Sequence, residues 1–282
     1  MDKPRIGLVL AGGGGKGAYQ IGVWKALKEY GIADRISGVS GTSVGALNAL
    51  LFANGDLDTA ERIWSSITQK DILTFDAKAA VKLMPLVFGG GFLPFSIGIN
   101  IAITRMLKNG VFSPEGIEQL ILRNIDFQRI AKLAMPVFAG AFALAGKRCK
   151  PGIRYLRMDG KDADTVKRIA MASSALPAIF PRQEIDRVSY MDGGVADNVP
   201  VKPLYDMGYR KIIVCHLDDD IKTGKLQKEY PDAELLEIVP QADQGGVISG
   251  LLDFTAEGAK RRMEQGYADM LRLLPQLTEL LQ

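Results

Sequence analysis

Apolar runs alternate with amphipathic segments through the first 53 residues. The residues Ile6–Leu10 predict a buried strand, and apolar side chains at three-to-four spacing predict a helix over Ala18–Tyr30 that stops at Gly31. A second short strand is predicted over Ile36–Ser40, followed by a tight turn and a helix through Phe52. This strand-helix-strand-helix order predicts a parallel sheet with right-handed crossovers.

The same patterns continue towards the C-terminus without a repeat, a low-complexity tract or an obvious linker. We therefore expect residues 1–282 to form a single domain. A helix is predicted over Thr165–Ser174, and a long amphipathic helix over Phe254–Leu274 closes the chain. The predicted apolar face of that last helix is Ala256, Ala259, Met263, Tyr267, Met270 and Leu274. Further strands are predicted over Pro136–Leu144, Ile153–Met158, Lys211–Leu217 and Leu235–Val239.

One uncharged segment, Leu83–Thr104, stands apart from this pattern, within a predicted insertion at about 76–108. Its length and polarity would suit a membrane span. Pro85, Pro94 and the glycines between them would break a spanning helix and leave backbone groups unpaired in hydrocarbon. An apolar lid or interfacial loop, of the kind that enzymes acting on lipid use, and a buried helical hairpin are the two other interpretations.

Composition and charge narrow the class of protein. Hydrophobic residues make up 47% and charged residues 24% of the chain, which is typical of a globular protein. The formal net charge is only +3 and like charges do not cluster, so we expect no nucleic-acid partner. The apolar start ends at four consecutive glycines without a cleavage site, which favours a cytoplasmic protein. Cys149 and Cys215 have no metal-ligand spacing, and we expect both to be buried, reduced thiols.

A candidate nucleophile lies in Gly41-Thr42-Ser43-Val44-Gly45, which fits the pattern G-x-S-x-G. A serine on a sharp strand-to-helix turn has strained backbone geometry, and its neighbours must be small. A strand is predicted before the motif and a helix after it, which is the required context. The alternative is a serine that only caps a helix in a glycine-rich turn.

The glycine loop after the first predicted strand allows three interpretations. A P-loop fails, because Leu10 and Gly17 occupy positions that need a glycine and a hydroxyl residue. A dinucleotide fingerprint is matched formally by Gly12, Gly14 and Gly17, but the second strand ends without the acidic residue that would hold the ribose. The third interpretation is an oxyanion hole built from backbone N–H groups beside Ser43. Its candidate residues are Gly12, Gly13, Gly14, Gly15, Lys16 and Gly17.

The base that would activate Ser43 has two candidates. Asp192-Gly193-Gly194 has a carboxylate followed by glycines that leave it uncrowded, although the sequence Asp-Gly-Gly is also common in ordinary turns. His216 is the single histidine, and the order Ser43, Asp192, His216 is that of an α/β-hydrolase triad. A lone histidine beside a strand is more often structural.

Together these motifs resemble the patatin-like phospholipase family over nearly the whole chain. The glycine-rich loop Gly12–Gly17, the nucleophile motif Gly41–Gly45 and the acidic motif Asp192–Gly194 are similar to the family's three signature blocks. Ala172–Pro177 resembles a proline-containing segment of the family, and Asp253–Tyr267 is similar to its bacterial members. The order and separation of these blocks are specific, whereas each block alone is not.

The resemblance implies a three-layer α/β/α fold with a mostly parallel sheet between helices. It also implies a Ser-Asp dyad, with Ser43 as nucleophile, Asp192 as base and the N–H of Val44 as an additional oxyanion donor. Burial is expected to raise the pKa of Asp192 above its usual value of about 4. Lys16 stands where the family often has arginine, and Gly15 adds flexibility to the loop. The supporting residues of the two motifs are Gly41, Gly45, Gly193 and Gly194.

The function implied by the resemblance is hydrolysis of acyl-ester lipids, of the phospholipase A or lysophospholipase type. Phospholipid or another acyl ester is the expected substrate, with peripheral contact to a membrane and without a metal or cofactor, since no ligand cluster is visible. The alternatives are a nonspecific carboxylesterase, an acyltransferase on the same serine scaffold, or a nucleotide-binding protein that uses the glycine loop.

Overall fold

The computed structural model describes residues 5–68, 74–75, 112–113, 116, 121–146 and 149–281. The predicted insertion at 76–108, with Leu83–Thr104 inside it, lies outside the described residues. No helix among the described residues is both long enough and apolar enough to cross a bilayer.

The strands are β1 (Ile6–Leu10), β2 (Ile36–Thr42), β3 (Thr74–Phe75), β4 (Phe112–Ser113), β5 (Val137–Ala143), β6 (Gly152–Arg157), β7 (Gln183–Ile185), β8 (Val188–Asp192), β9 (Lys211–Cys215) and β10 (Glu234–Ile238). The α-helices are α1 (Ala18–Glu29), α2 (Val44–Asn54), α3 (Leu57–Ser66), α8 (Phe127–Lys132), α9 (Ala163–Ser173), α10 (Lys202–Asp206), α11 (Lys225–Glu229), α12 (Ala256–Arg272) and α13 (Leu274–Leu280).

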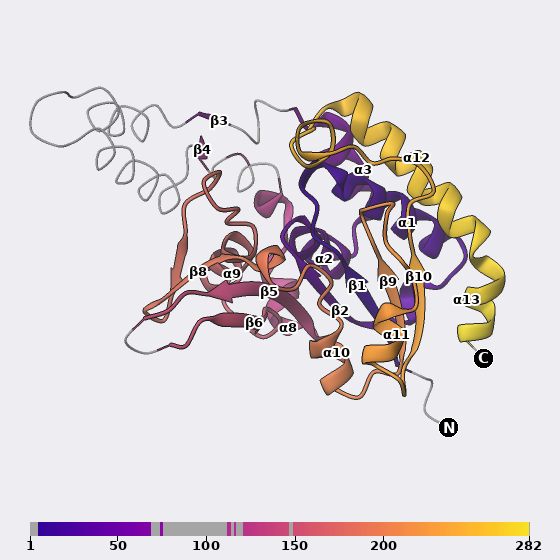
Figure 1. The fold of residues 1–282 in the computed structure, drawn as a ribbon, viewed down its shortest axis with the longest axis horizontal. Helices are drawn as coiled ribbons and strands as arrows, with labels where there is room; N and C mark the ends of the chain where they lie inside the picture. Colours follow the sequence, from indigo (N-terminus) through magenta and orange to yellow (C-terminus); the bar gives the residue numbers. More distant parts are fainter. Residues whose placement is uncertain are drawn as a thin grey trace, which may run out of the picture.

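An eight-stranded mixed sheet forms the centre of the molecule, with the order β10-β9-β1-β2-β5-β8-β7 and with β6 also paired to β5. The strands from β10 to β5 are parallel, as the sequence predicts. Helical crossovers return the chain over the sheet between β1 and β2 and between β9 and β10. β6, β7 and β8 add an antiparallel part beyond them. The prediction of a mostly parallel sheet is confirmed (Figure 1).

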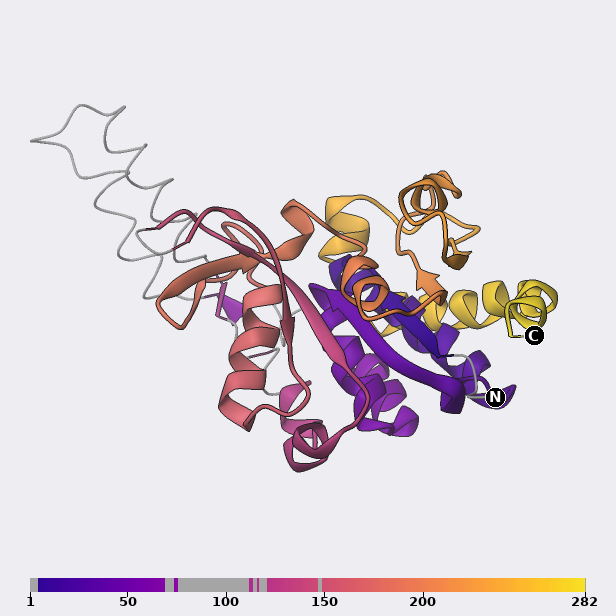
Figure 2. The same ribbon diagram turned by 90° about the horizontal axis from the view of Figure 1, so that it is seen from below.

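Helices cover both faces of this sheet, so the fold has three layers (Figure 2). The side chains of β1 show why: Leu8 and Leu10 belong to a large core with the longer helices, whereas Val9 belongs to a second core on the other face. Leu204 of α10 and Tyr209 lie in that second core. A strand that is apolar on both faces must be covered on both, which is why Ile6–Leu10 is continuously apolar.

The closing helix differs from its predicted apolar face. α12 runs along α1 (Figure 1) and buries Ala259 and Met270 as predicted, but Ala256 is exposed and Leu274 belongs to α13. The buried face instead includes small and charged residues, because α12 packs very closely on α1 and because two of its buried side chains form ion pairs with less buried partners. These residues are Gly258, Arg262, Gly266 and Asp269.

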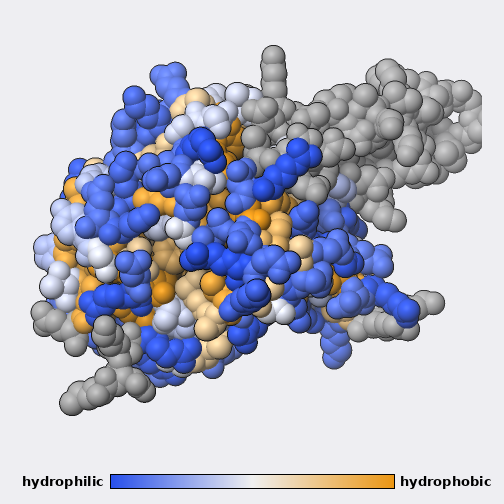
Figure 3. Space-filling view, turned by 180° about the vertical axis from the view of Figure 1, so that it is seen from behind, coloured by the Kyte–Doolittle hydropathy of each residue, from blue (hydrophilic) through white to orange (hydrophobic). Residues whose placement is uncertain are grey.

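Polar side chains cover much of the face opposite to that of Figure 1, with apolar residues visible between them (Figure 3). The two cysteines are free. Cys215 is buried at the end of β9, as predicted. The prediction is wrong for Cys149, which is only half-buried because it lies in the connection between β5 and β6, paired by a bridge to Gly146.

Candidate active site

Ser43 occupies a sharp turn between β2 and α2. Its backbone angles are φ 56° and ψ −126°, a conformation that residues other than glycine rarely adopt and that stores strain. The flanking glycines are sterically required: a Cβ on Gly41 would lie 2.2 Å from the carbonyl oxygen of Gly45, and one on Gly45 would lie 2.1 Å from that of Leu10. The strand-turn-helix context predicted for the G-x-S-x-G motif is therefore present, and α2 begins directly after the serine.

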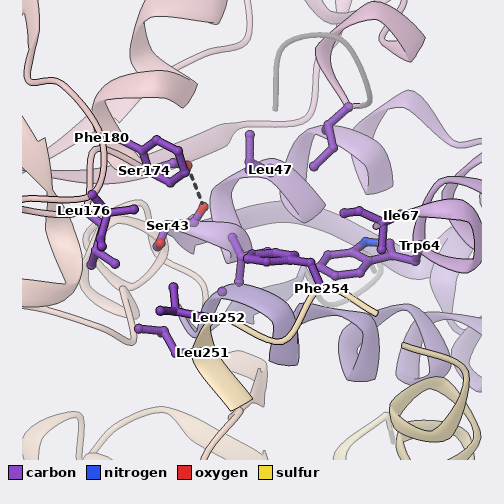
Figure 4. A pocket seen from close by; sticks show the side chains of 14 residues that line it. Ser43, Leu47, Trp64, Ile67, Ser174, Leu176, Phe180, Leu251, Leu252 and Phe254 are labelled. Carbon is purple, nitrogen blue, oxygen red and sulfur yellow. Dashed lines mark hydrogen bonds between the residues drawn. The ribbon is translucent and has the colours of Figure 1, made fainter. Parts of the chain in front are cut away.

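Hydrogen bonds from distant segments hold this turn in place. The Ser43 N–H donates to Oγ of Ser173 at 3.0 Å, and that hydroxyl donates to the carbonyl of Gly140 at 2.6 Å. Oγ of Ser174 donates to the carbonyl of Ser43 at 3.4 Å (Figure 4). Both serines belong to the block Ala172–Pro177, which sequence reasoning singled out only by resemblance and without a role. The structure shows that this block fixes the strained turn.

The topology of β5 explains how Asp192 comes close to Ser43. β6 occupies one edge of β5, and the other edge is shared by β2 and β8. β2 ends there with Thr42 opposite Gly140, and β8, running in the opposite direction, ends with Asp192 opposite Ala141. Gly140 and Ala141 are consecutive, so the C-terminal ends of the two strands meet head to head. The structure therefore brings Ser43 and Asp192 together, as the family resemblance implies.

The carboxylate of Asp192 is 1% exposed and is held in one orientation. Its Oδ1 accepts from the N–H of Gly194 at 2.7 Å. Burial raises its pKa to about 6, and hydrogen bonding from the Ser43 hydroxyl and the Gly194 N–H limits that rise. Oδ2 has no partner of full hydrogen-bond geometry among the described residues. The Ser43–Asp192 contact is thus looser than an ideal hydrogen bond, as is common before substrate binds.

The glycine loop lies directly against this pair. A Cβ on Gly12 would lie 3.1 Å from the Cβ of Ser43 and 2.4 Å from Oδ1 of Asn198. Asn198 also fixes the loop, because Gly12 donates its N–H to the Asn198 carbonyl at 3.1 Å while Nδ2 of Asn198 donates to the Gly12 carbonyl at 3.0 Å. In the described part of the chain, the N–H groups of Gly13 and Gly14 have no backbone acceptor. Sequence reasoning missed Asn198, whose only signal is its position six residues after Asp192.

The remaining loop residues are engaged in packing or pairing. The N–H of Lys16 donates to the Gly13 carbonyl at 3.1 Å, and its ammonium group pairs with Asp218 at 2.7 Å. Gly17 lies where a Cβ would be 2.5 Å from a methyl group of Val44. Val44 itself is the first residue of α2, so its N–H has no acceptor within the helix and is available beside Ser43.

An apolar pocket opens at Ser43 (Figure 4) and is partly continuous with solvent. Its only polar side chains among the described residues are those of Ser43, Ser174 and the indole of Trp64. That indole N–H donates to Oδ1 of Asn48 at 3.0 Å, so the pocket receives mainly its apolar surface. The other lining residues are Gly14, Val44, Leu47, Ile67, Ile121, Leu176, Ile179, Phe180, Leu251, Leu252 and Phe254.

His216 has a different partner. Its Nε2 lies 3.0 Å from Oε2 of Glu237, both side chains are buried, and burial lowers the pKa of the imidazole. Oε1 of Glu237 accepts from the N–H of Gly224, so the pair ties β9 and β10 to the loop that connects β9 with α11. The described residues that line the pocket do not include His216. Nor do the described residues contain a group of three or more His, Cys, Asp and Glu side chains placed to hold a metal ion.

The fold and the site first define a class: a three-layer α/β/α protein with a serine on a strained strand-to-helix turn, a buried carboxylate behind it and an apolar pocket in front. The model of the patatin-like phospholipase family matches residues 8–205. The chain belongs to that family.

Curated relatives agree with this assignment, and solved structures share the fold. An uncharacterized NTE family protein of Mycobacterium bovis is 29% identical over 203 residues, which are 72% of this chain and 46% of the relative. The lysophospholipase NTE1 of Cryptococcus neoformans is 26% identical over 212 residues, which are 74% of this chain but only 11% of that protein. The chain thus spans less than half the length of these relatives. In fold it is similar to VipD from Legionella pneumophila, with a TM-score of 0.58, 16% identity and coverage of 96% of this chain and 67% of that one. The human GIVD cytosolic phospholipase A2 gives a TM-score of 0.55 at 9% identity, over 99% of this chain and 60% of that one.

Proposed function

We propose that this protein is a lipid acyl hydrolase of the phospholipase A or lysophospholipase type, which cleaves carboxylic esters through Ser43 and Asp192. The observation that carries the proposal is the position of Ser43, whose hydroxyl lies between a buried carboxylate and an apolar pocket of acyl-chain character. Membership in the patatin-like phospholipase family supports it, as does the similarity to a relative named as a lysophospholipase.

In the acylation step, Asp192 accepts the hydroxyl proton of Ser43 as its Oγ attacks the ester carbonyl. The developing oxyanion is stabilised by backbone N–H groups. We assign this role to Gly13, Gly14 and Val44, because Gly12 already donates its N–H to Asn198. Collapse of the tetrahedral intermediate releases the alcohol, which takes the proton from Asp192, and leaves an acyl ester on Ser43.

Deacylation repeats the same chemistry with water. Asp192 accepts a proton from the attacking water, the tetrahedral intermediate forms against the same N–H groups, and its collapse returns the proton to Ser43 Oγ and frees the fatty acid. The raised pKa of Asp192 suits this role, because a carboxylate with a pKa of about 6 is a stronger base than an exposed aspartate. The base therefore needs no histidine.

The pocket favours an acyl chain over the nucleotide that the glycine loop would otherwise suggest. Gly14 faces apolar side chains such as Leu47 and Phe254, which offer no partner to a charged phosphate or a ribose hydroxyl. Buried apolar surface of this kind stabilises methylene groups by about 0.8 kcal/mol each. We therefore propose phospholipids, lysophospholipids or other acyl-ester lipids as substrates, met by peripheral contact with a membrane.

A fluorophosphonate probe tests the proposal directly. The purified protein is expected to form a covalent adduct that peptide mapping places on Ser43, and to release fatty acid from a panel of phospholipid and lysophospholipid vesicles. Competition by substrate should slow labelling. An unlabelled Ser43 together with intact lipids would exclude the hydrolase, whereas transfer of the acyl group to an added alcohol in preference to water would indicate an acyltransferase.

His216→Ala is expected to leave kcat/KM for ester hydrolysis close to the wild-type value, because His216 pairs with Glu237 and does not line the pocket. Its effect should appear in the free energy of unfolding, since Glu237 would remain buried without its partner. Ester kinetics and thermal unfolding of the same preparation separate the two effects. A loss of activity as large as that of Asp192→Asn would instead support a Ser-Asp-His triad.

A further inference from the structure

Part of the apolar pocket is built from a segment that the family model does not cover. The match ends at residue 205, but Leu251, Leu252 and Phe254 line the pocket together with Ser43 (Figure 4). We call these three residues the C-terminal wall. Leu251 is the last residue of a short π-helix, Val247–Leu251, and all three residues precede α12. The wall therefore faces whatever acyl chain Ser43 receives.

The backbone of the C-terminal wall packs against the glycine loop. A Cβ on Gly14 would lie 2.1 Å from the carbonyl oxygen of Leu251, and a Cβ on Gly15 would lie 2.1 Å from that of Asp253. Gly15 is thus required by this close approach and not only for flexibility. The contact also means that the wall and the proposed oxyanion donors lie in one packed unit.

Arg262 of α12 holds the segment that carries the wall. Its side chain is 1% exposed, and its guanidinium group reaches three points of residues 244–253. Nη1 pairs with Oδ2 of Asp253 at 2.9 Å, and Nη2 donates to the carbonyl of Ser249 at 3.0 Å and to that of Gln244 at 3.4 Å. Hydrogen bonds from Thr255 and Arg262 outweigh the effect of burial and lower the pKa of Asp253, so its carboxylate is ionised near neutral pH.

The position of Arg262 is fixed by the packing of α12 on α1. A Cβ on Gly22 of α1 would lie 1.9 Å from the carbonyl oxygen of Met263, and a Cβ on Gly266 would lie 2.0 Å from that of Tyr19. Two glycines thus let the helix backbones touch. Since α1 follows the glycine loop directly, this contact places Arg262 at a set distance from the loop. A planar guanidinium with several donors can then fix the segment in both position and orientation.

We propose that Arg262 is a positioning residue whose ion pair with Asp253 keeps the C-terminal wall against the acyl pocket, and that the wall makes this site selective for long acyl chains. The inference rests on the proposed ester hydrolysis at Ser43. Each methylene that the wall covers raises the relative kcat/KM about fourfold, whereas a short chain leaves most of the wall uncovered. Arg262 touches neither the reacting atoms nor the chain.

The test compares kcat/KM for the p-nitrophenyl butyrate and decanoate esters, both below their micellar concentrations. Wild-type protein is expected to prefer the decanoate strongly. Arg262→Gln should lower the decanoate-to-butyrate ratio by about tenfold or more, which corresponds to losing contact with two or more methylenes. Arg262→Lys keeps one charged contact to Asp253 and should lie between the two. Leu252→Ala removes part of the wall itself and should lower the ratio in the same direction.

Arg261→Gln is the matched control, because its side chain is exposed on the same helix, and its ratio should equal that of wild type. An equal loss on both esters in Arg262→Gln would show a merely structural arginine and overturn the proposal. If that variant does not fold, an unchanged ratio in both Arg262→Lys and Leu252→Ala overturns it equally. Wild-type protein that cleaves both esters without preference would refute only the proposed chain-length selectivity of the C-terminal wall. Protein that cleaves neither ester and leaves Ser43 unlabelled would refute the proposed ester hydrolysis.

Discussion

The kcat of ester hydrolysis is expected to fall about 10⁶-fold in Ser43→Ala, which is the loss that follows removal of the nucleophile in a serine hydrolase. The reason is that, in the part of the chain that the structure describes, the neighbouring hydroxyls have other roles: Oγ of Ser174 donates to the Ser43 carbonyl, and Oγ of Ser173 donates to the Gly140 carbonyl. The measurement is kcat/KM on a monomeric ester together with loss of fluorophosphonate labelling. Activity retained in the variant would remove Ser43 from the mechanism.

The fold should survive that substitution, because backbone groups make the bonds that hold the turn. The Ser43 N–H and carbonyl keep their partners Ser173 and Ala46 whatever the side chain is. Ser43→Gly provides a matched comparison, since glycine tolerates φ 56° and relieves strain of about 1–3 kcal/mol, which exceeds its entropic disadvantage of about 0.5–1 kcal/mol. We expect the glycine variant to be inactive and more stable than the alanine variant in chemical denaturation.

Local sequence patterns predict the parallel half of the fold because the sequence of each element there reflects how deeply that element is buried. Ile6–Leu10 is apolar at every position, which is what a strand buried on both faces requires, and β1 has the predicted bounds. The turn at Ser43 could be predicted for a similar reason. Its glycines are required by close backbone contacts within a few residues or with the adjacent strand.

In the antiparallel part, β6 has a predicted counterpart over Ile153–Met158, whereas β7 and β8 could not be predicted in this way. β8 is short and mixes polar with apolar residues, so Val188–Asp192 gives no clear strand signal. Asp192 lies close to Ser43 only because β8 pairs with the part of β5 that β2 leaves unpaired. Such pairing depends on chain topology and not on the local sequence. Sequence alone brings the two residues together only through the family resemblance.

Partners that act through the backbone were also invisible in the sequence. Asn198 fixes Gly12 through reciprocal bonds, and Ser173 links the nucleophile turn to β5. Arg262 lies on what the pattern predicts to be the polar side of an amphipathic helix, yet it is almost fully buried. Polar residues whose partners are distant backbone carbonyls have no periodicity of their own, so only coordinates reveal them.

Asp192→Asn should lower kcat/KM by about 10²-fold or more, in line with the loss of a general base. In wild-type protein the carboxylate must be ionised to accept the Ser43 proton, so we expect kcat/KM to rise with pH to a plateau above about 6, the value to which burial raises the Asp192 pKa. The residual activity of the variant should lack this inflection. Asp186→Asn, at an exposed position in the β7–β8 turn, is the control that should keep it.

The same buried carboxylate should also affect folding stability, with a defined sign. The folded-state pKa of about 6 lies above the ordinary value of 3.8, so folding favours the protonated form, and this contribution is present below about pH 4 and is lost as pH rises to about 6. The difference of about two pKa units corresponds to about 3 kcal/mol. The free energy of unfolding of Asp192→Asn, minus that of wild type, should therefore increase by about this amount between pH 4 and pH 7, whatever offset the amide introduces. A difference that stays constant with pH would show that Asp192 is not the buried, destabilised base that the proposed mechanism requires.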